Sequence, residues 1–223
     1  MSTLNEHNNF LYLTASLLIL LVAAPLADIF PQGFAYWILK AITTVTIITG
    51  YLSLNFGPLW RRFTGALLLL MIVSSVMREQ FHWVYAHLFD LAIMLAFFLA
   101  AAYSAAKRVL LKGKVDGNKI VGAVAVYLLL GLIWATLYLI VLEFSPTAFN
   151  GMEQLNWEDN FSIATYFSYV TLTTLGYGDI SPAEPLSRVL VYLEAIVGVF
   201  YMAVVIASLI GSRVGRHEIN DER

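Results

Sequence analysis

The feature that most constrains this chain is a series of long apolar runs. A helix needs about 20 mostly apolar residues to cross a bilayer, and six candidate runs can be traced through the 223 residues, the third of them short. The composition agrees, because 60% of the residues are apolar and 13% are charged, against about 45–50% and about 25% in soluble domains. The sequence therefore predicts an all-α integral membrane protein with six transmembrane helices. The expected spans are 10–29, 34–54, 63–77, 83–106, 120–142 and 186–211.

Lysine and arginine predict the orientation of these spans. Residues 61–62, 107–119 and 213–223 contain most of the basic side chains, and all three segments fall on one side of the membrane if both termini share that side. The opposite side carries only Arg78 and Arg188, together with six acidic residues in the loop before the last span. Cytoplasmic loops retain positive charge. We therefore expect a multi-pass protein of the cell membrane with both termini in the cytoplasm.

The chain divides into two modules. Residues 1–112 contain four spans joined by short loops, and residues 113–118 form a polar, glycine-containing linker at the cytoplasmic face. Glycine and polar residues between apolar runs are typical of loops. Residues 119–213 are expected to form a helix, a re-entrant loop and a second helix. The last ten residues, 214–223, form a short cytoplasmic tail.

The re-entrant loop contains the sequence Thr-Leu-Gly-Tyr-Gly-Asp, which starts at Thr174. Irregular backbone at membrane depth is tolerated where it is covered by protein or lines a water-filled path. Gly176 and Gly178 can adopt positive φ without steric cost, so alternating backbone conformations can turn successive carbonyls toward one axis. Stacked rings of carbonyl oxygens can replace the hydration shell of a monovalent cation. The oxygens would come from the carbonyls of Thr174, Leu175, Gly176 and Tyr177 and from the Thr174 hydroxyl.

This sequence resembles the potassium-channel family, whose filter signature is Thr-Val-Gly-Tyr-Gly followed by Asp. The match covers Thr174, Gly176, Tyr177, Gly178 and Asp179. The resemblance extends to Thr171 and to the aromatic pair Tyr166-Phe167, which stand where the family has a threonine and bulky aromatics of the pore helix. The whole segment from Lys119 to Arg213 is similar to the family's helix, pore loop and helix. A prokaryotic member is the expectation.

The resemblance implies a homotetramer around one central pore, with potassium ions held by the filter and no organic cofactor. The ion-binding residues would be Thr174, Leu175, Gly176, Tyr177 and Gly178. Leu175 departs from the usual valine and changes the packing behind the filter by one methylene. Two outcomes stay open for it: altered selectivity or inactivation, or a neighbouring residue that compensates.

Other residues are expected to support the filter. The pore helix is predicted to begin at Asp159 or Asn160, which are good N-cap residues, and to end near Val170. Its carboxyl end would then offer partial negative charge to a cation. By resemblance, Tyr166 could donate a hydrogen bond to Asp179 behind the filter; the alternative is a tyrosine that is merely packed at the interface.

Two residues of the last span are candidates for gating and support. Gly198 resembles the family's hinge glycine, although close packing against a neighbouring helix explains it almost as well. A glycine lowers the cost of bending a helix. Glu194 lies one turn before it within apolar sequence. A carboxyl group inside the membrane is a functional candidate, and a hydrogen-bonded brace behind the filter is the alternative.

The first module resembles the sensor of six-span, voltage-gated channels but lacks its charges. Residues 84–106 contain no basic residue other than His87. Lys40 and Asp90 are predicted to lie at a similar depth and to form an ion pair that braces this module. Each charge alone is expensive in hydrocarbon, at about 2.5–3.5 kcal/mol. The alternative is that Lys40 extends outward to the headgroups while Asp90 is protonated or bonded elsewhere.

These observations favour a potassium-selective channel with passive conduction that is not strongly voltage-gated. A non-selective cation channel, a potassium-transporter subunit and a membrane protein that conducts nothing are the alternatives. No enzyme is expected, because the four histidines form no metal-binding cluster and no nucleophile–base motif appears. The net charge of −2 does not suggest a nucleic-acid partner. Membrane lipids are the expected surroundings, and ligand gating would need a separate cytoplasmic regulator or a removed segment.

Overall fold

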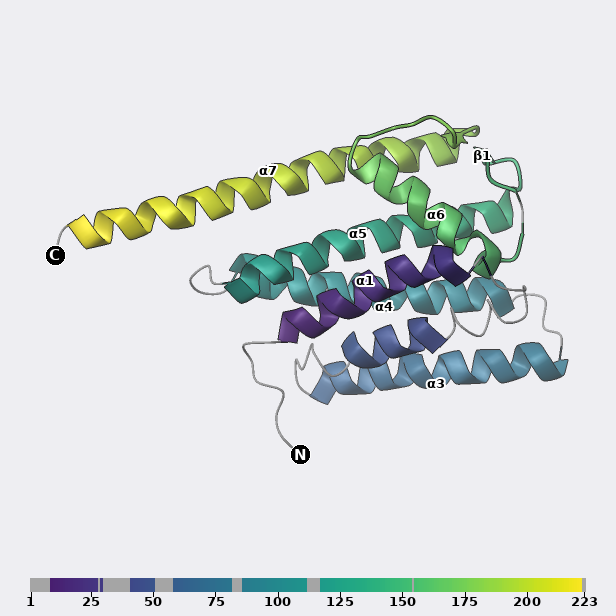
Figure 1. Ribbon diagram of the computed structural model, residues 1–223. Coiled ribbons are helices and arrows are strands. Elements are labelled where there is room, and N and C mark those ends of the chain that lie inside the picture. Colours follow the sequence, from purple (N-terminus) through teal and green to yellow (C-terminus); the bar gives the residue numbers. More distant parts are fainter. Residues whose placement is uncertain are drawn as a thin grey trace.

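The computed structural model describes residues 9–27, 29, 41–50, 58–81, 86–111, 117–153 and 155–221, which are mostly helical (Figure 1). Two short strands, β1 and β2, pair antiparallel, with Phe149 opposite Pro182. In chain order the elements are α1 (Asn9–Ala27), an unlabelled helical segment (Ala41–Gly50), α3 (Pro58–Phe81), α4 (Ala86–Leu111), α5 (Gly117–Phe144), β1 (Phe149–Asn150), α6 (Trp157–Leu172), β2 (Ser181–Pro182) and α7 (Pro185–Asp221).

In the part of the chain that the structure describes, three helices are long and apolar enough to cross a membrane. They contain the stretches Ala86–Val109, Gly117–Phe144 and Pro185–Val205. The structure thus supports a membrane protein and three of the six expected spans. Among the described residues, the other predicted spans correspond to shorter apolar helices, at Phe10–Leu26, Ala41–Gly50 and Arg62–Ser74.

The long helices run alternately up and down. The start of α3, the end of α4, the start of α5 and the end of α7 lie at one end of the molecule, on the left of Figure 1. α6 and the loop that follows it lie toward the opposite end. Arg62, Lys107 and Lys119 therefore share one end of the bundle. This arrangement agrees with the sidedness that the distribution of basic residues predicts.

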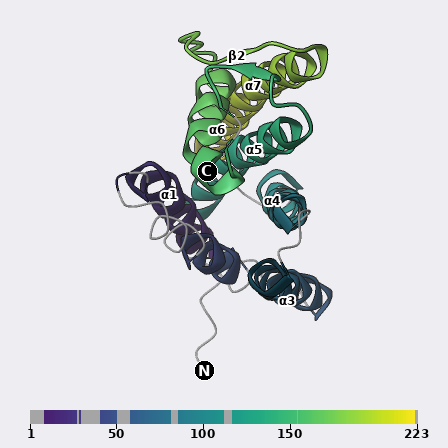
Figure 2. The same cartoon turned by 90° about the vertical axis from the view of Figure 1, so that its right-hand side faces the viewer.

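α5 is the most enclosed of the long helices, because α1, α4, α6 and α7 all contact it. Small residues allow the close contact between α5 and α6. A methyl group added at Gly131 would lie 2.5 Å from the ring of Tyr169, and the Tyr169 hydroxyl donates to the carbonyl of Leu128 at 2.6 Å. Viewed along the bundle, α5, α6 and α7 form one group, and α3 lies away from it, beyond α4 (Figure 2).

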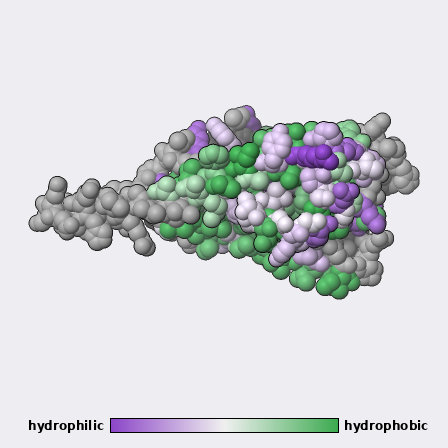
Figure 3. Space-filling view, turned by 90° about the horizontal axis from the view of Figure 1, so that it is seen from above, coloured by the Kyte–Doolittle hydropathy of each residue, from purple (hydrophilic) through white to green (hydrophobic). Residues whose placement is uncertain are grey.

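α7 is the most exposed of the three long apolar helices. Only 11% of its most apolar window is buried, against 67% for α5. Its exposed side chains are large and apolar, and apolar residues gather over the middle of the face seen in Figure 3, while polar residues gather toward the end that carries the strands. The exposed apolar side chains of α7 include Leu186, Val189, Tyr192, Ile196, Val199 and Phe200.

Some expected boundaries differ from the structure. α5 begins at Gly117, so the last two residues of the expected linker 113–118 belong to a helix. α6 begins at Trp157, two residues before the earlier of the two predicted starts, and ends at Leu172. The predicted ion pair involves Lys40, which lies outside the described residues; Asp90 lies in the first turns of α4.

Candidate functional site

The short helix α6 leads into the Thr-Leu-Gly-Tyr-Gly-Asp loop. Its N-cap residue is Asn156, and Glu158 and Asp159 occupy the first turn. Negative charge there stabilises a helix by interacting with the positive end of its dipole. Asn160 was predicted as a possible cap, and this is wrong. Asn160 lies inside the helix, and its side-chain amide donates to the carbonyl of Glu153 at 2.7 Å. It therefore fastens the preceding loop to the helix.

Backbone hydrogen bonds hold the start of the loop against the last turn of α6. The N–H of Thr174 donates to the carbonyl of Thr171 at 2.9 Å. The N–H groups of Leu175 and Gly176 both donate to the carbonyl of Val170, at 2.9 and 3.2 Å. Thr171, a predicted support residue, thus contributes through its backbone. The loop starts from a defined position at the carboxyl end of the helix.

The backbone of the loop alternates in hand. Thr174, Gly176 and Gly178 have φ values of 59°, 59° and 82°, while Leu175 and Tyr177 between them have ordinary negative φ. Positive φ was expected from the two glycines, and the structure shows it. Thr174 was not expected to adopt it, because positive φ is unusual for a β-branched residue. A positive φ at every second residue is the pattern that can turn successive carbonyls toward one side.

Two neighbouring aromatic residues of α6 make different contacts. The Tyr166 hydroxyl donates to Oδ2 of Asp179 at 2.7 Å, so the hydrogen bond that the sequence suggested is present. Phe167 is buried, and its ring centroid lies 5.1 Å from that of Tyr138 and 5.7 Å from that of Phe149. The first contact ties the end of the loop to α6, and the second anchors α6 to α5.

Glu194 of α7 lies in a buried polar cluster between α5, α6 and α7. Its carboxyl group is 0% exposed and accepts a hydrogen bond from the Tyr138 hydroxyl. The Ser168 hydroxyl lies 2.5 Å from Oε1 of Glu194 and 2.7 Å from the carbonyl of Gly131. Glu194 is thus hydrogen-bonded, as one sequence-based alternative proposed. Tyr138 and Ser168 could not be chosen as its partners from the sequence, in which they are two of several polar residues in apolar helices.

Gly198 is placed where α7 passes the end of α6. A methyl group at this position would collide with the carbonyl oxygen of Leu172 and would lie 3.1 Å from the Leu172 side chain. Leu172 is the last residue of α6. The structure therefore assigns close packing to Gly198, which was the alternative to a hinge.

The loops on either side of α6 are joined around Glu184, just before α7. Its Oε1 accepts hydrogen bonds from the hydroxyls of Ser145 and Thr147, at 2.5 and 2.7 Å. These two bonds hold the pKa of the Glu184 carboxyl below its ordinary value of 4.5, because they stabilise the charged form. The carbonyl of Ala148 accepts from the N–H of Ala183 at 2.9 Å and from the Ser187 hydroxyl at 2.7 Å. The end of α5 and the start of α7 are thereby clasped together.

The first module contacts α6 near the same end of the molecule. Nδ1 of His87 in α4 lies 3.8 Å from Oε2 of Glu158 in α6. Asp90 follows one turn later on α4. The structure therefore places His87 at the junction between the two modules, which the sequence did not suggest.

Comparison with known proteins agrees with this geometry. Residues 124–212 match a family described as ion channel. The matched part, residues 124–212, is named the ion channel domain after this family. It contains most of α5, all of α6 and the alternating loop, and α7 as far as residue 212. The match points to a channel and not to an enzyme.

A relative with a curated description supports the same conclusion. The chain is 46% identical over 57 residues to the inward rectifier potassium channel Kirbac3.1 of Paramagnetospirillum magnetotacticum. The matched segment is 26% of this chain and 19% of that protein, so the similarity concerns a part of each. It supports a relation of the channel domain to the potassium-channel family. No solved structure matches this chain significantly.

Proposed function

We propose that this protein is a potassium-selective channel that conducts passively through one central pore formed by four copies of the chain. The alternating backbone at Thr174, Gly176 and Gly178 carries the proposal. Such a backbone can present a ladder of carbonyl oxygens that replaces the hydration shell of a dehydrated cation. Potassium is the preferred ion because the loop follows the potassium-channel signature, with Leu175 in place of valine.

The carboxyl end of α6 favours the same ion. The helix ends at Leu172, directly before the loop, and its last carbonyls carry partial negative charge. A cation held by the loop would therefore be stabilised by the dipole of α6. Tyr166 and Asp179 support the loop from behind through their hydrogen bond.

The proposal of four copies rests on the single filter sequence in the chain. A closed ring of carbonyl oxygens needs several identical contributors, and one chain supplies one set. The exposed side chains of Leu175 and Tyr177, at 55% and 68% exposure, are available to contact neighbouring copies, as is the apolar face of α7. The six-span topology, the cytoplasmic termini, the cell-membrane location and the Lys40–Asp90 pair are parts of the same proposal.

Reconstitution into vesicles with ion-flux and single-channel recording tests the proposal. Wild type should show a reversal potential close to that of potassium in mixed potassium and sodium, and its mass in detergent should correspond to four chains. Gly176→Ala should abolish selective conduction, because an L residue is strained at a φ of 59° even though no atom lies within 4 Å of the added methyl group.

Gly65→Ala is the matched control for that variant. Gly65 lies in α3, its added methyl group also meets nothing within 4 Å, and its φ is not positive. It should conduct like wild type. Unchanged potassium selectivity in Gly176→Ala would contradict the filter assignment.

Two alternatives remain distinguishable in the same recordings. A non-selective cation channel would reverse near zero in mixed potassium and sodium. A potassium-transporter subunit would give flux without unitary channel currents. The ion channel domain of residues 124–212 favours the channel over the transporter.

A further inference from the structure

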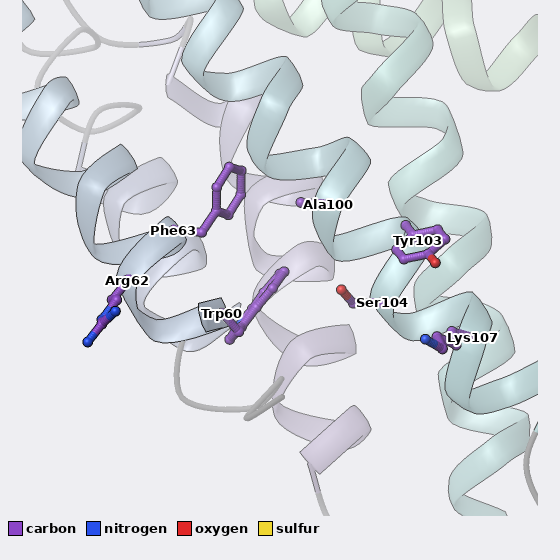
Figure 4. Close-up of a pocket in the computed structure, with 7 residues that line it drawn as sticks. All are labelled: Trp60, Arg62, Phe63, Ala100, Tyr103, Ser104 and Lys107. Atoms are coloured by element: carbon purple, nitrogen blue, oxygen red, sulfur yellow. The ribbon is translucent and has the colours of Figure 1, made fainter. Parts of the chain in front are cut away.

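A cleft between α3 and α4 is separate from the ion channel domain. It has a volume of about 780 Å³, which lies within the range of about 300–1,000 Å³ that is usual for small-molecule sites. Its lining comes from the first turns of α3 and the last turns of α4 (Figure 4). The lining residues are Trp60, Arg62, Phe63, Ala100, Tyr103, Ser104 and Lys107.

The lining changes in character along the helices. Ala100 lies seven residues before Lys107 on α4, or roughly 10 Å at about 1.5 Å per residue. In Figure 4, Ala100 and Phe63 lie at one end of the cleft and Trp60 and Ser104 lie nearer the other end. Lys107 lies beyond Ser104 on α4, and Arg62 lies on the far side of Trp60 with its side chain directed away from α4. The cleft thus has an apolar end that faces the middle of the bundle and a basic end that faces the end of the bundle.

Both cations lie on the side of the membrane where basic loops gather. Arg62 is in the first turns of α3, Lys107 is near the end of α4, and both side chains are exposed. Tyr103 is 69% exposed, one turn further toward the apolar end, and aromatic rings of this kind are enriched at the membrane interface. The cleft therefore places positive charge, an aromatic ring and apolar surface in the order in which a phospholipid presents phosphate, glycerol region and acyl chain.

From this order we infer that the cleft binds an anionic phospholipid of the cytoplasmic leaflet, with its headgroup phosphate at the basic end, near Lys107 and Arg62, and an acyl chain along Phe63 and Ala100. Basic pockets between transmembrane helices on the cytoplasmic side are suited to anionic headgroups. A zwitterionic lipid carries the same phosphate, but its own cation offsets the attraction to the two basic residues. The inference does not depend on which ion the channel domain conducts.

Lipid competition on the full-length protein tests this inference. Detergent first removes the bound lipids from the purified protein. The protein is then exposed to an equimolar mixture of phosphatidylglycerol and phosphatidylcholine with identical chains, and mass spectrometry counts the lipids that it retains. Wild type should retain phosphatidylglycerol over phosphatidylcholine by roughly tenfold or more, because each basic residue adds roughly fivefold to the binding of an anionic lipid. The variant Arg62→Gln/Lys107→Gln should reduce that preference to about twofold or less.

The control variant Arg108→Gln/Lys119→Gln removes the same charge from the same end of the molecule but from residues that do not line the cleft. It should retain the preference of wild type. An equal loss in both variants would show general attraction to the surface and would overturn the inference, as would equal retention of both lipids by wild type.

A second measurement separates a lipid from a free anion. Glycerol phosphate, which has the charged headgroup without acyl chains, should not raise the thermal unfolding midpoint of the stripped protein. Phosphatidylglycerol should raise it in wild type and in the control variant but not in Arg62→Gln/Lys107→Gln. Equal stabilisation by glycerol phosphate and by the lipid would show an anion site without a place for the chain, which would overturn the inference.

Discussion

Gly176 and Gly198 meet different constraints within the same site. Gly176 needs a positive φ, and space for a side chain is available around it. Gly198 has an ordinary helical backbone, and space is what it lacks, because the carbonyl oxygen of Leu172 occupies the position of a side chain. Substitution should therefore affect conduction directly at Gly176 and helix packing at Gly198.

Gly198→Ala should destabilise the protein by about 1–3 kcal/mol, as overpacking of a close contact does. The atom in the way is backbone, so a change of side-chain rotamer cannot relieve the collision. Thermal unfolding in one detergent measures the loss. Gly65→Ala is the control and should be neutral or slightly stabilising, because alanine is the better helix former. If both variants unfold at the same temperature, the close contact assigned to Gly198 is absent.

Glu184 should make the contact between the segment after α5 and the start of α7 depend on pH. Its pKa in the folded protein lies below the ordinary value of 4.5, so its contribution to stability is complete above the unfolded pKa and is lost as the pH falls through the folded one. The difference in unfolding midpoint between wild type and Glu184→Gln should be constant above about pH 5 and should shrink at lower pH.

Glu153→Gln is the control for this pH dependence. Glu153 is an exposed acid in the same outer segment, and its backbone carbonyl, which substitution leaves in place, accepts from Asn160. The difference in unfolding midpoint between wild type and Glu153→Gln should stay small across the same pH range. If the difference in unfolding midpoint between wild type and Glu184→Gln grows as the pH falls, the result would contradict the assigned hydrogen bonds.

At the residue scale, local backbone chemistry decides what the sequence can predict. Positive φ at Gly176 and Gly178 was predictable, because glycine adopts it at no steric cost. Positive φ at Thr174 was not, because local preference opposes it and its N–H instead bonds to the carbonyl of Thr171 at the end of α6. Asn160 was misassigned for a related reason: a good capping residue can also lie inside a helix and bond to the preceding loop, here at Glu153.

At the scale of elements, α5, α6 and α7 meet at Glu194. Ser168 has one hydroxyl hydrogen but two acceptors, the carbonyl of Gly131 and Oε1 of Glu194. A protonated Glu194 can donate to Ser168, which then donates to Gly131, while Tyr138 donates to the other carboxyl oxygen. Every polar atom of the cluster is satisfied in this arrangement, and buried polar groups are normally satisfied.

Glu194→Gln should therefore lower the stability of the protein only slightly, because the amide can donate to Ser168 and accept from Tyr138 in the same geometry. Glu194→Ala should cost about 1–3 kcal/mol, since it leaves two buried hydroxyl groups without this partner. Thermal unfolding and potassium flux at pH 7 measure both variants. A loss for Glu194→Gln as large as that for Glu194→Ala would show that the cluster needs a charged carboxylate.

The helices of the channel domain were the most predictable elements. The expected spans 120–142 and 186–211 lie within α5 and α7, because long apolar runs determine them. The partners of Glu194 were not predictable, because Tyr138 and Ser168 lie 56 and 26 residues away in the chain. Such contacts depend on how α5, α6 and α7 cross, which apolar periodicity does not specify.

At the scale of the whole molecule, the two modules differ in how they are joined. Helices α5, α6 and α7 are joined by the buried hydrogen bonds around Glu194 and by a partly buried bond from the Tyr201 hydroxyl of α7 to the carbonyl of Ala123 in α5 at 2.5 Å. The first module meets α6 through His87 and Glu158 and packs on α5 through α1 and α4. α4 packs on α5 and reaches α6 at His87 and Glu158, so a movement of α4 would be transmitted to α6 through α5 and through this pair.

The composition of α4 limits what could move it. Residues 84–106 contain no lysine or arginine, and Lys107 and Arg108 stand at the end of the helix. Moving one elementary charge through the membrane potential is worth about 2.3 kcal/mol per 100 mV, which corresponds to an e-fold change in open probability over about 25 mV. We therefore expect an open probability that needs about 25 mV or more for each e-fold change.

Single-channel recordings in symmetric potassium, between about −100 and +100 mV, measure this slope; that range spans about 4.6 kcal/mol for one charge. Lys107→Gln and Arg108→Gln should leave the slope unchanged, because both residues lie at the end of α4 and outside the field. A slope of e-fold over about 5 mV would require about five charges to cross the membrane. Since α4 has no such set between residues 84 and 106, that result would place a voltage sensor in another element and contradict the proposal of a channel that is not strongly voltage-gated.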